Sequence, residues 1–461
     1  MRFAVLNGSP KGDVSVTMQY VRLIEKKYPS HEFLIHNISQ RISKLEEDEG
    51  AFQEIIRSIA SADGVLWAFP LYYFLVPSQY KRFIELLWER SSTGAFKEKY
   101  AAVFSTSIHF FDHIAHSYLN AVCDDLSMRF FGGFSADMYD LLKEKERERL
   151  LSFVSAFIEA TQNKIPTLRN YPPLIPVSLQ YSPSEPKGSL DTGGKRVLIL
   201  HDVKDPQSNA GKMIDFLRKK LSGKPEIYNL FDVHIQGGCL GCLQCGYDNQ
   251  CAYTGKDDFI EFFNTKVKTA DILIFAGTVV DRYLSSRWKM FFDRSFFNTH
   301  TPSFAGKQIG FILSGPLAQL PHLRQFMEAY TEMQQANLAG VVTDECADSA
   351  DLDEKLSALA HCLLDCASRD YVRPRTFLGV GAMKVFRDDI YGRLRFPFLA
   401  DHNYYKEHGL YDFPQKHYRA RVRNGILGLL ARISSFRKEV YKKRMKGEMI
   451  KPLKDFIDQL P

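Results

Sequence analysis

Features that direct a chain into a membrane or out of the cell are missing from this sequence of 461 residues. It has no run of about 18 apolar residues, so we expect no transmembrane helix. Its first residues reach Gly8-Ser9-Pro10 after a short apolar stretch and lack the apolar segment of a signal peptide. With 45% hydrophobic and 25% charged residues, the composition is typical of a globular protein, which we expect to be cytoplasmic.

The chain also lacks a strong charge imbalance, because its net charge is only +6. The basic excess lies after residue 371, and a solvated basic face needs no ligand, so we expect no nucleic-acid partner. Four of the eight cysteines lie between residues 239 and 251. Such crowding in a long chain without an export signal indicates metal or redox chemistry rather than a disulfide framework.

Short apolar strands alternate with amphipathic helices in the first part of the chain. This alternation predicts an α/β fold with a parallel sheet that carries helices on both faces. We expect strands at residues 3–8, 32–38, 64–70 and 101–107, and helices at 15–27, 77–89 and 142–161.

The same pattern restarts after a segment rich in Pro, Ser and Gly. Residues 2–6 align with 196–200, and Lys81 aligns with Lys289, so we interpret the chain as a duplication. The second copy is longer between its first and third strands, where the clustered cysteines lie. The predicted domains are residues 1–170, a linker at 171–194, residues 195–370, and a basic, aromatic-rich, mostly helical extension at 371–461.

Three loops of the first copy follow strand ends, where ligands bind in doubly wound sheets. Residues 7–12, with hydroxyls just beyond, suit a phosphate at a helix N-terminus, although an ordinary capped turn explains them equally well. Residues 68–74 are aromatic and would be buried by stacking on a planar ring or by a dimer contact. Residues 105–109 add polar groups.

These loops resemble those of the NAD(P)H-dependent FMN reductase family, which is flavodoxin-like. The resemblance rests on Gly8-Ser9-Pro10-Lys11 and on Pro70-Leu71-Tyr72 before the helix that carries Lys81, and it covers about residues 1–165. The sequence departs from the family after Lys11, where the usual Asn/Ser-Thr pair is absent. The resemblance implies FMN contacts from Ser9, Lys11, Ser15, Thr17, Pro70, Leu71, Tyr72, Tyr73, Ser105 and Thr106.

The second copy carries the cysteines with the spacing C-x2-C-x2-C-x5-C. Sets of four thiolates hold iron–sulfur clusters, whereas structural zinc usually takes two separated pairs; zinc and unliganded thiols both stay open. Together with residues 255–259, the spacing resembles the iron–sulfur flavoprotein family over about residues 195–345. The resemblance implies a [4Fe–4S] cluster that exchanges electrons with FMN. The implied metal ligands are Cys239, Cys242, Cys245 and Cys251.

The first loop of the second copy differs from that of the first. Residues 201–206 lack Gly-Ser and contain two carboxylates, which would repel a phosphate. We therefore expect FMN in the first copy and the cluster in the second. His300 is a candidate for approaching a substrate.

The extension is predicted to contain a basic amphipathic helix at residues 419–446. Such a helix packs on its own domain or lies on an anionic membrane.

Together these features predict a flavin-dependent oxidoreductase that transfers electrons between FMN and a [4Fe–4S] cluster. It would be linked to NAD(P)H or ferredoxin, with a small-molecule or protein electron donor or acceptor. NAD(P)H would bind transiently, because no Gly-x-Gly-x-x-Gly fingerprint follows a strand. The alternatives are an NAD(P)H:quinone or FMN reductase with a structural zinc, and a non-enzymatic redox carrier or sensor. The sequence leaves a homo-oligomer open.

Overall fold

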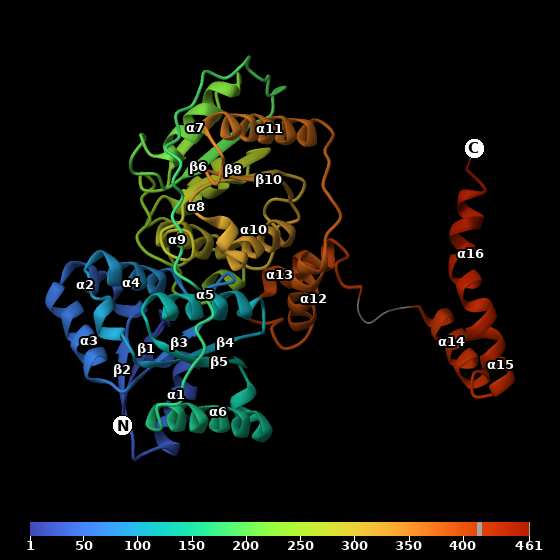
Figure 1. Cartoon of the computed structure of the whole chain (residues 1–461). Coiled ribbons are helices and arrows are strands. Elements are labelled where there is room, and N and C mark those ends of the chain that lie inside the picture. Colours follow the sequence, from blue (N-terminus) through green and yellow to red (C-terminus); the bar gives the residue numbers. More distant parts are fainter. Residues whose placement is uncertain (413–416, 461) are drawn as a thin grey trace. The chain divides into compact units, whose positions relative to one another are not determined.

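The computed structural model describes residues 1–412 and 417–460. Its contacts divide the chain into two units, Met1–Tyr404 and Tyr405–Pro461, and each is described by itself. Residues 413–416 and 461 of the predicted extension lie outside the described residues. The first unit contains two separate parallel sheets, each flanked by helices (Figure 1).

The first sheet has five parallel strands in the order β2-β1-β3-β4-β5. This is the flavodoxin-like order predicted for the first copy. The bounds of its strands and helices are β1 Arg2–Asn7, α1 Val16–Lys27, β2 Glu32–Asn37, α2 Ile42–Glu47, α3 Glu49–Ser61, β3 Gly64–Pro70, α4 Ser78–Glu89, β4 Tyr100–Ser107, α5 Asp112–Asp125, β5 Arg129–Asp137 and α6 Glu144–Gln162.

The second sheet repeats this arrangement, with five parallel strands in the order β10-β9-β8-β6-β7. The first strand of each copy, β1 or β6, lies second from one edge of its sheet, between the second and third strands of that copy, so the predicted duplication is confirmed at the level of the fold. The bounds are β6 Val197–His201, α7 Asn209–Lys220, β7 Glu226–Asn229, α8 Phe259–Phe262, β8 Ile272–Thr278, α9 Ser286–Arg294, β9 Gln308–Ser314, α10 Pro321–Met333, β10 Asn337–Thr343 and α11 Ser349–Ser368.

The sequence of β1 explains why it forms an interior strand of the first sheet. In β1 every residue after Arg2 is buried, as expected for a parallel strand covered by helices on both faces. The turn after β1 ends where Ser15 caps α1, with its Oγ accepting the Met18 N–H at 3.3 Å. Gly8 allows this turn to lie against the sheet, because a Cβ there would be 2.8 Å from the Phe69 Cβ. The chain thus returns over the carboxyl end of the sheet.

The two copies contact each other through α4 and α9, which occupy equivalent positions in the repeat. A carboxylate from each helix caps the other helix: Glu85 accepts the Ser286 N–H at 2.5 Å, and Asp293 accepts the Ser78 N–H at 2.7 Å. A two-fold axis between α4 and α9 would exchange these two caps. The duplicated chain therefore packs against itself as two subunits of a dimer would.

Buried lysines lie beside both caps. Lys81 bridges Glu85 at 2.8 Å and Asp281 of the second copy at 3.0 Å. Lys289 pairs with Asp293 and donates to the Tyr72 carbonyl of the first copy at 2.8 Å. These paired charges fix the orientation of the copies at the edge where the candidate site lies.

The beginning of the extension belongs to the first unit. Helix α12 (Phe377–Tyr391) buries Phe386 and Ile390, and Leu394 and Phe398 are buried just before α13 (Leu399–Glu407). The extension is held at the carboxyl end of β5, where Arg393 makes two hydrogen bonds with Asp137, of 2.7 and 2.6 Å.

The second unit contains α14 (Tyr418–Leu430), α15 (Ser434–Lys438), a π-helical turn at Glu439–Arg444 and α16 (Met445–Ile457). The single helix predicted at residues 419–446 is therefore wrong, because it breaks at residues 431–433. The chain is extended at Ile433, with φ −75° and ψ 118°, and a new helix starts at Ser434. None of the residues of α14 is buried. No helix in the described part of the chain combines the length and apolar character needed to cross a membrane.

Candidate active site

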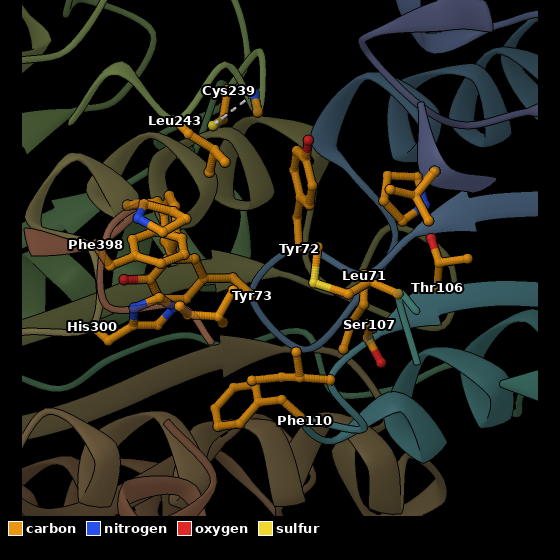
Figure 2. Close-up of a pocket in the computed structure, with 18 of the residues that line it drawn as sticks. Leu71, Tyr72, Tyr73, Thr106, Ser107, Phe110, Cys239, Leu243, His300 and Phe398 are labelled. Carbon is orange, nitrogen blue, oxygen red and sulfur yellow. Dashed lines mark hydrogen bonds between the residues drawn. The ribbon is translucent and has the colours of Figure 1, made fainter. Parts of the chain in front are cut away.

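A cavity of about 370 Å³ opens at the carboxyl end of the first sheet. This volume lies in the range of about 300–1,000 Å³ that is common for small-molecule and cofactor sites. Its wall combines residues of the first copy, the second copy and the extension (Figure 2). We call it the interdomain pocket.

Eight of the ten residues predicted to contact FMN line this pocket: Lys11, Ser15, Thr17, Pro70, Leu71, Tyr72, Tyr73 and Thr106. The other two lie behind it. Ser9 is buried, and its Oγ accepts the Lys11 N–H at 3.3 Å. Ser105 is buried, and its Oγ is 2.7 Å from the His116 Nε2. The binding role of all ten stays a prediction.

Hydroxyl groups gather where the first and third loops meet. The Thr17 Oγ1 lies 2.7 Å from the Thr106 Oγ1, and Ser15 stands at the N-terminus of α1. The first N–H groups of a helix have no partner within it, and the helix dipole favours an anion there. Lys11 adds a cation, although burial lowers the pKa of its ammonium. This donor set fits the phosphate of FMN.

The second loop supplies flat apolar surface. Tyr73 and Phe74 both have positive φ, of 37° and 67°, an unusual conformation for large side chains. Hydrogen bonds between the backbones of Tyr72 and Leu75 hold the turn, at 2.9 and 3.0 Å. The turn projects Leu71, Tyr72 and Tyr73 into the pocket, where Figure 2 shows them between Cys239 and Phe110. Such surface fits the ring system of a flavin.

The cysteine loop of the second copy forms another wall. Cys239, Gly241 and Leu243 line the interdomain pocket, and the Gln79 side chain of α4 donates to the Cys239 carbonyl at 3.1 Å. Gly241 has a φ of 63°, and a Cβ there would collide with the Tyr72 hydroxyl. The loop can approach the first copy this closely only because glycine occupies that position.

All four clustered cysteines line one small cavity next to the pocket. Burial raises the pKa of Cys239 to about 12, and the charges of Asp293, Cys245 and Cys251 raise it as well. Within residues 1–412 and 417–460, however, no three His, Cys, Asp or Glu side chains form a metal-binding group.

Arg294 lines the same small cavity and organises the base of the loop. Its guanidinium donates to the Gly237 carbonyl at 2.9 Å and to Asp257 at 2.7 and 3.0 Å, and it stacks on Tyr253. Its Nε is buried without a hydrogen-bond partner in the described structure. A buried cationic donor beside four thiols fits an anionic iron–sulfur cluster, whose thiolates and sulfides accept hydrogen bonds.

The equivalent edge of the second sheet is filled by the chain itself. The Asp344 carboxylate accepts hydrogen bonds from Asn209 at 2.8 Å, Ser314 at 2.6 Å and the Gly315 N–H at 2.8 Å. The linker crosses the same place, where Leu179 accepts a hydrogen bond from Asn209 at 2.7 Å. The expectation that flavin belongs to the first copy stays a prediction.

Sequence reasoning missed much of the remaining wall. The extension contributes several side chains that no local pattern connects with the loops of the first copy, and the second copy contributes residues beyond its cysteines. These additional lining residues are Val16, Phe110, Met138, Tyr139, Asp293, Phe296, Thr299, His300, Met333, Phe386, Leu394, Pro397 and Phe398, whereas Ser107 and Ile108, which also line the pocket, belong to the predicted third loop. Of these, His300 had been noted from its place after α9.

Comparison with known families decides what the two copies are. A family model described as NADPH-dependent FMN reductase matches residues 1–136 and again residues 195–347. The chain belongs to this family. Its two copies are thus FMN-reductase domains, and the chain is a member of a flavin-dependent oxidoreductase family.

Solved structures with similarity to this chain cover about one copy each. The flavoenzyme NAD(P)H:acceptor oxidoreductase FerB from Paracoccus denitrificans is 20% identical, with 35% of this chain and 97% of that chain covered and a TM-score of 0.30. General stress protein 14 from Treponema denticola, in complex with FMN, is 13% identical, with 35% and 99% covered and a TM-score of 0.28. An FMN-dependent NADH-azoreductase from Bacillus anthracis, in complex with FMN, is 15% identical, with 36% and 99% covered and a TM-score of 0.26. No curated protein matches the chain.

Proposed function

We propose that this FMN-reductase family member is a two-cofactor oxidoreductase, with FMN in the interdomain pocket and a [4Fe–4S] cluster on Cys239, Cys242, Cys245 and Cys251. FMN accepts electrons singly or in pairs and the cluster takes them singly, so the two together would link a two-electron donor such as NAD(P)H to a one-electron partner such as ferredoxin. The protein residues hold the two cofactors and exclude water between them.

One observation carries the proposal: the cysteine loop is part of the wall of the interdomain pocket. Cys239 lines both the interdomain pocket and the small cysteine cavity. The charges of Cys239 and Cys242 also act on Lys11 of the first phosphate loop, where both raise the pKa of the ammonium against the effect of burial. The sites proposed for the two cofactors are therefore contiguous.

Residues of the first copy would hold FMN. Ser15, Thr17 and Lys11 would bind its phosphate at the start of α1, and Tyr72 and Tyr73 would cover its ring. The Thr17–Thr106 hydrogen bond ties the first loop to the third. NAD(P)H would approach through the same pocket, because the family is described as NADPH-dependent.

Residues of the second copy would hold the cluster. Arg294 is almost fully buried, and its ion pair with Asp257 fixes it under the cysteine loop. A zinc ion on the same cysteines is the alternative, and it would make the chain a simple NAD(P)H:quinone or FMN reductase. A carrier or sensor without turnover is the other alternative.

The test is anaerobic purification followed by assays of flavin, iron, acid-labile sulfide and zinc on the same sample. We expect about one flavin, four irons and four sulfides per chain, because a [4Fe–4S] cluster contains four of each. Cys242→Ser should lose iron and sulfide and keep flavin. Cys346→Ser is the matched control, because Cys346 lies outside the loop, and it should keep all three. Stoichiometric zinc without sulfide would contradict the cluster, and rapid turnover with NAD(P)H would contradict a passive carrier.

A further inference from the structure

Arg294 ends α9 under the cysteine loop, and one of its nitrogens has no hydrogen-bond partner. The residue is 1% exposed. Its two terminal nitrogens donate to the Gly237 carbonyl at 2.9 Å and to Asp257 at 2.7 and 3.0 Å. Its Nε is buried and finds no acceptor among the described residues. Proteins seldom bury a charged donor without a partner, because its lost hydration is not replaced, so this nitrogen is a candidate donor to a ligand.

The position of Arg294 relates this donor to the cysteines. Seven described residues have a buried side-chain nitrogen or oxygen without a partner, and Arg294 is the one among them that lines the small cysteine cavity. All four clustered cysteines line the same cavity. The Tyr253 ring also lines it, with its centroid 4.1 Å from the Arg294 Cζ, and holds the plane of the guanidinium. A group bound by the four sulfur atoms therefore lies against the guanidinium.

The ion pair of Arg294 with Asp257 has a definite direction relative to the cavity. Arg294 lines the cavity, whereas Asp257 is not among the described residues that do so. The Asp257 carboxylate is held by the backbone N–H groups of Gln236 at 3.0 Å and Phe259 at 3.3 Å. The exposed fractions of the two paired side chains are 1% and 0%, so water screens the pair weakly. The cysteines therefore face the positive end of a buried ion pair.

Two other cations near the cysteines are balanced or closer to solvent. Lys289 pairs with Asp293 and donates to a carbonyl of the first copy. Lys11 is partly exposed and belongs to the first copy, in the wall of the interdomain pocket. The Cys239 Sγ accepts a hydrogen bond from the Gly241 N–H at 3.4 Å, and this donor is neutral (Figure 2). Arg294 is thus the buried cation whose position is fixed toward the cysteines.

We propose that Arg294 sets the reduction potential of the cluster, by donating a hydrogen bond from Nε and by facing the cluster with its positive charge. The inference rests on the proposed function, since it requires a [4Fe–4S] cluster on the four cysteines. Reduction adds one negative charge to such a cluster, and net charge and hydrogen bonds to its sulfur atoms are among the factors that set its potential. A fixed cation and donor stabilise the reduced form more than the oxidised form, so Arg294 raises the potential.

A raised potential gives the electrons a direction. NAD(P)H, oxidised to NAD(P)⁺ and a proton, supplies two electrons to FMN. The cluster, stabilised in its reduced form, accepts them one at a time and passes them to two molecules of a one-electron acceptor. The partner inferred for this chain is therefore an oxidised one-electron carrier, and the electrons leave through the cysteine loop, where Cys242 is exposed.

Substitutions of the ion pair separate its charge from its contribution to folding. Asp257→Asn removes the anion and keeps Arg294, and the asparagine oxygen can still accept the Gln236 N–H. Arg294→Gln/Asp257→Asn differs from it only at Arg294 and leaves no charge of the pair buried alone. Arg287→Gln is the matched control, because Arg287 is a second arginine of α9 whose guanidinium donates to the Leu230 carbonyl at 2.8 and 2.5 Å. Thermal unfolding and assays of iron and sulfide check that each variant folds and holds the cluster.

The readout is the midpoint potential of the cluster, which needs no turnover. An anaerobic redox titration measures it by visible absorbance and by electron paramagnetic resonance of the reduced cluster. We expect the potential to fall in the order Asp257→Asn, wild type, Arg294→Gln/Asp257→Asn. Between the two variants, the ratio of reduced to oxidised cluster at one applied potential should differ at least tenfold, which is about 59 mV for a one-electron couple. Arg287→Gln should match wild type.

Equal potentials in the two variants, or a higher potential in the double variant, would overturn the inference, while iron and sulfide in the wild type would leave the proposed function standing. If Asp257→Asn does not fold, wild type and the double variant still give the comparison, because neither buries one charge of the pair alone. Equal potentials in those two proteins would then overturn the inference. Wild-type protein without iron and sulfide would overturn the proposed function and the inference with it.

Discussion

Lys81 provides the sharpest test of how the two copies are joined. Its side chain has no exposed surface, and it lies between Glu85 of its own helix and Asp281 of the second copy. Lys81→Met keeps a similar length and removes the cation, which leaves two carboxyl groups buried side by side. Removing one partner of a buried ion pair costs about 3–5 kcal/mol, so we expect the free energy of unfolding to fall by that amount.

The loss should depend on pH in a defined direction. Burial raises the pKa of Glu85, but Lys81 and Ser286 outweigh burial and hold it below its ordinary value. Without Lys81 the pKa of Asp281, which burial already holds above its ordinary value, rises further, while Glu85 keeps Arg82 at 3.2 Å. The folded variant then binds more protons than the unfolded chain, so its stability falls as pH rises through the interval between the unfolded and folded pKa values of Asp281. The deficit relative to wild type should therefore be smallest at low pH.

Urea unfolding at several pH values measures both effects. The double variant Lys81→Met/Asp281→Asn should recover part of the loss, because one of the two carboxylates is gone. Lys44→Met, an exposed residue of α2, should change stability by less than about 0.5 kcal/mol. A loss below about 1 kcal/mol for Lys81→Met, or a deficit that grows at low pH, would refute this account of the interface.

Three further predictions concern the cysteine loop, a buried histidine and the second unit. Gly241→Ala should reduce iron incorporation while the chain still folds, because a φ of 63° strains alanine and its Cβ would displace the Tyr72 hydroxyl; full iron content would contradict the described loop. Burial lowers the pKa of His322 to about 4. Because the unfolded chain then binds the proton more readily, the free energy of unfolding should fall by roughly 3 kcal/mol as pH falls from about 6.5 to 4. In His322→Gln, urea unfolding should show a smaller fall in this free energy over the same pH interval. Leu429 and Leu430 are exposed on the basic helix α14, so the wild-type chain should float with vesicles that contain phosphatidylserine and not with neutral vesicles. The variant Leu429→Ser/Leu430→Ser should not float with either. Equal flotation of the wild type with both kinds of vesicle would exclude an anionic membrane as partner.

Much of the fold could be predicted because parallel strands covered on both faces leave a strong local pattern. The expected strand at residues 64–70 is β3, and the expected strand at residues 101–107 lies within β4. The alignment of Lys81 with Lys289 revealed the duplication. What it could not reveal is that Glu85 and Asp293 cap each other's helices, since reciprocal caps require the two copies to be placed in space.

Only those parts of the site that are formed by residues close together in the sequence could be predicted. Strand ends and glycine turns locate the loops of the first copy, and cysteine spacing locates the loop of the second. Phe386 and Phe398 could not be assigned to the pocket, because nothing in their sequence pattern relates them to loops several hundred residues earlier. The place of Arg294 beside the cysteines was hidden for the same reason.

The most direct test of the central claim is an anaerobic titration of the purified chain with NADPH, followed by visible absorbance. If FMN and a [4Fe–4S] cluster occupy adjoining sites, the flavin band and a broad absorbance across the visible range should both bleach in wild type. Cys242→Ser should show the flavin band alone. Wild-type protein in which the flavin band bleaches and no broad absorbance is present, or in which that absorbance stays unchanged, would contradict the account.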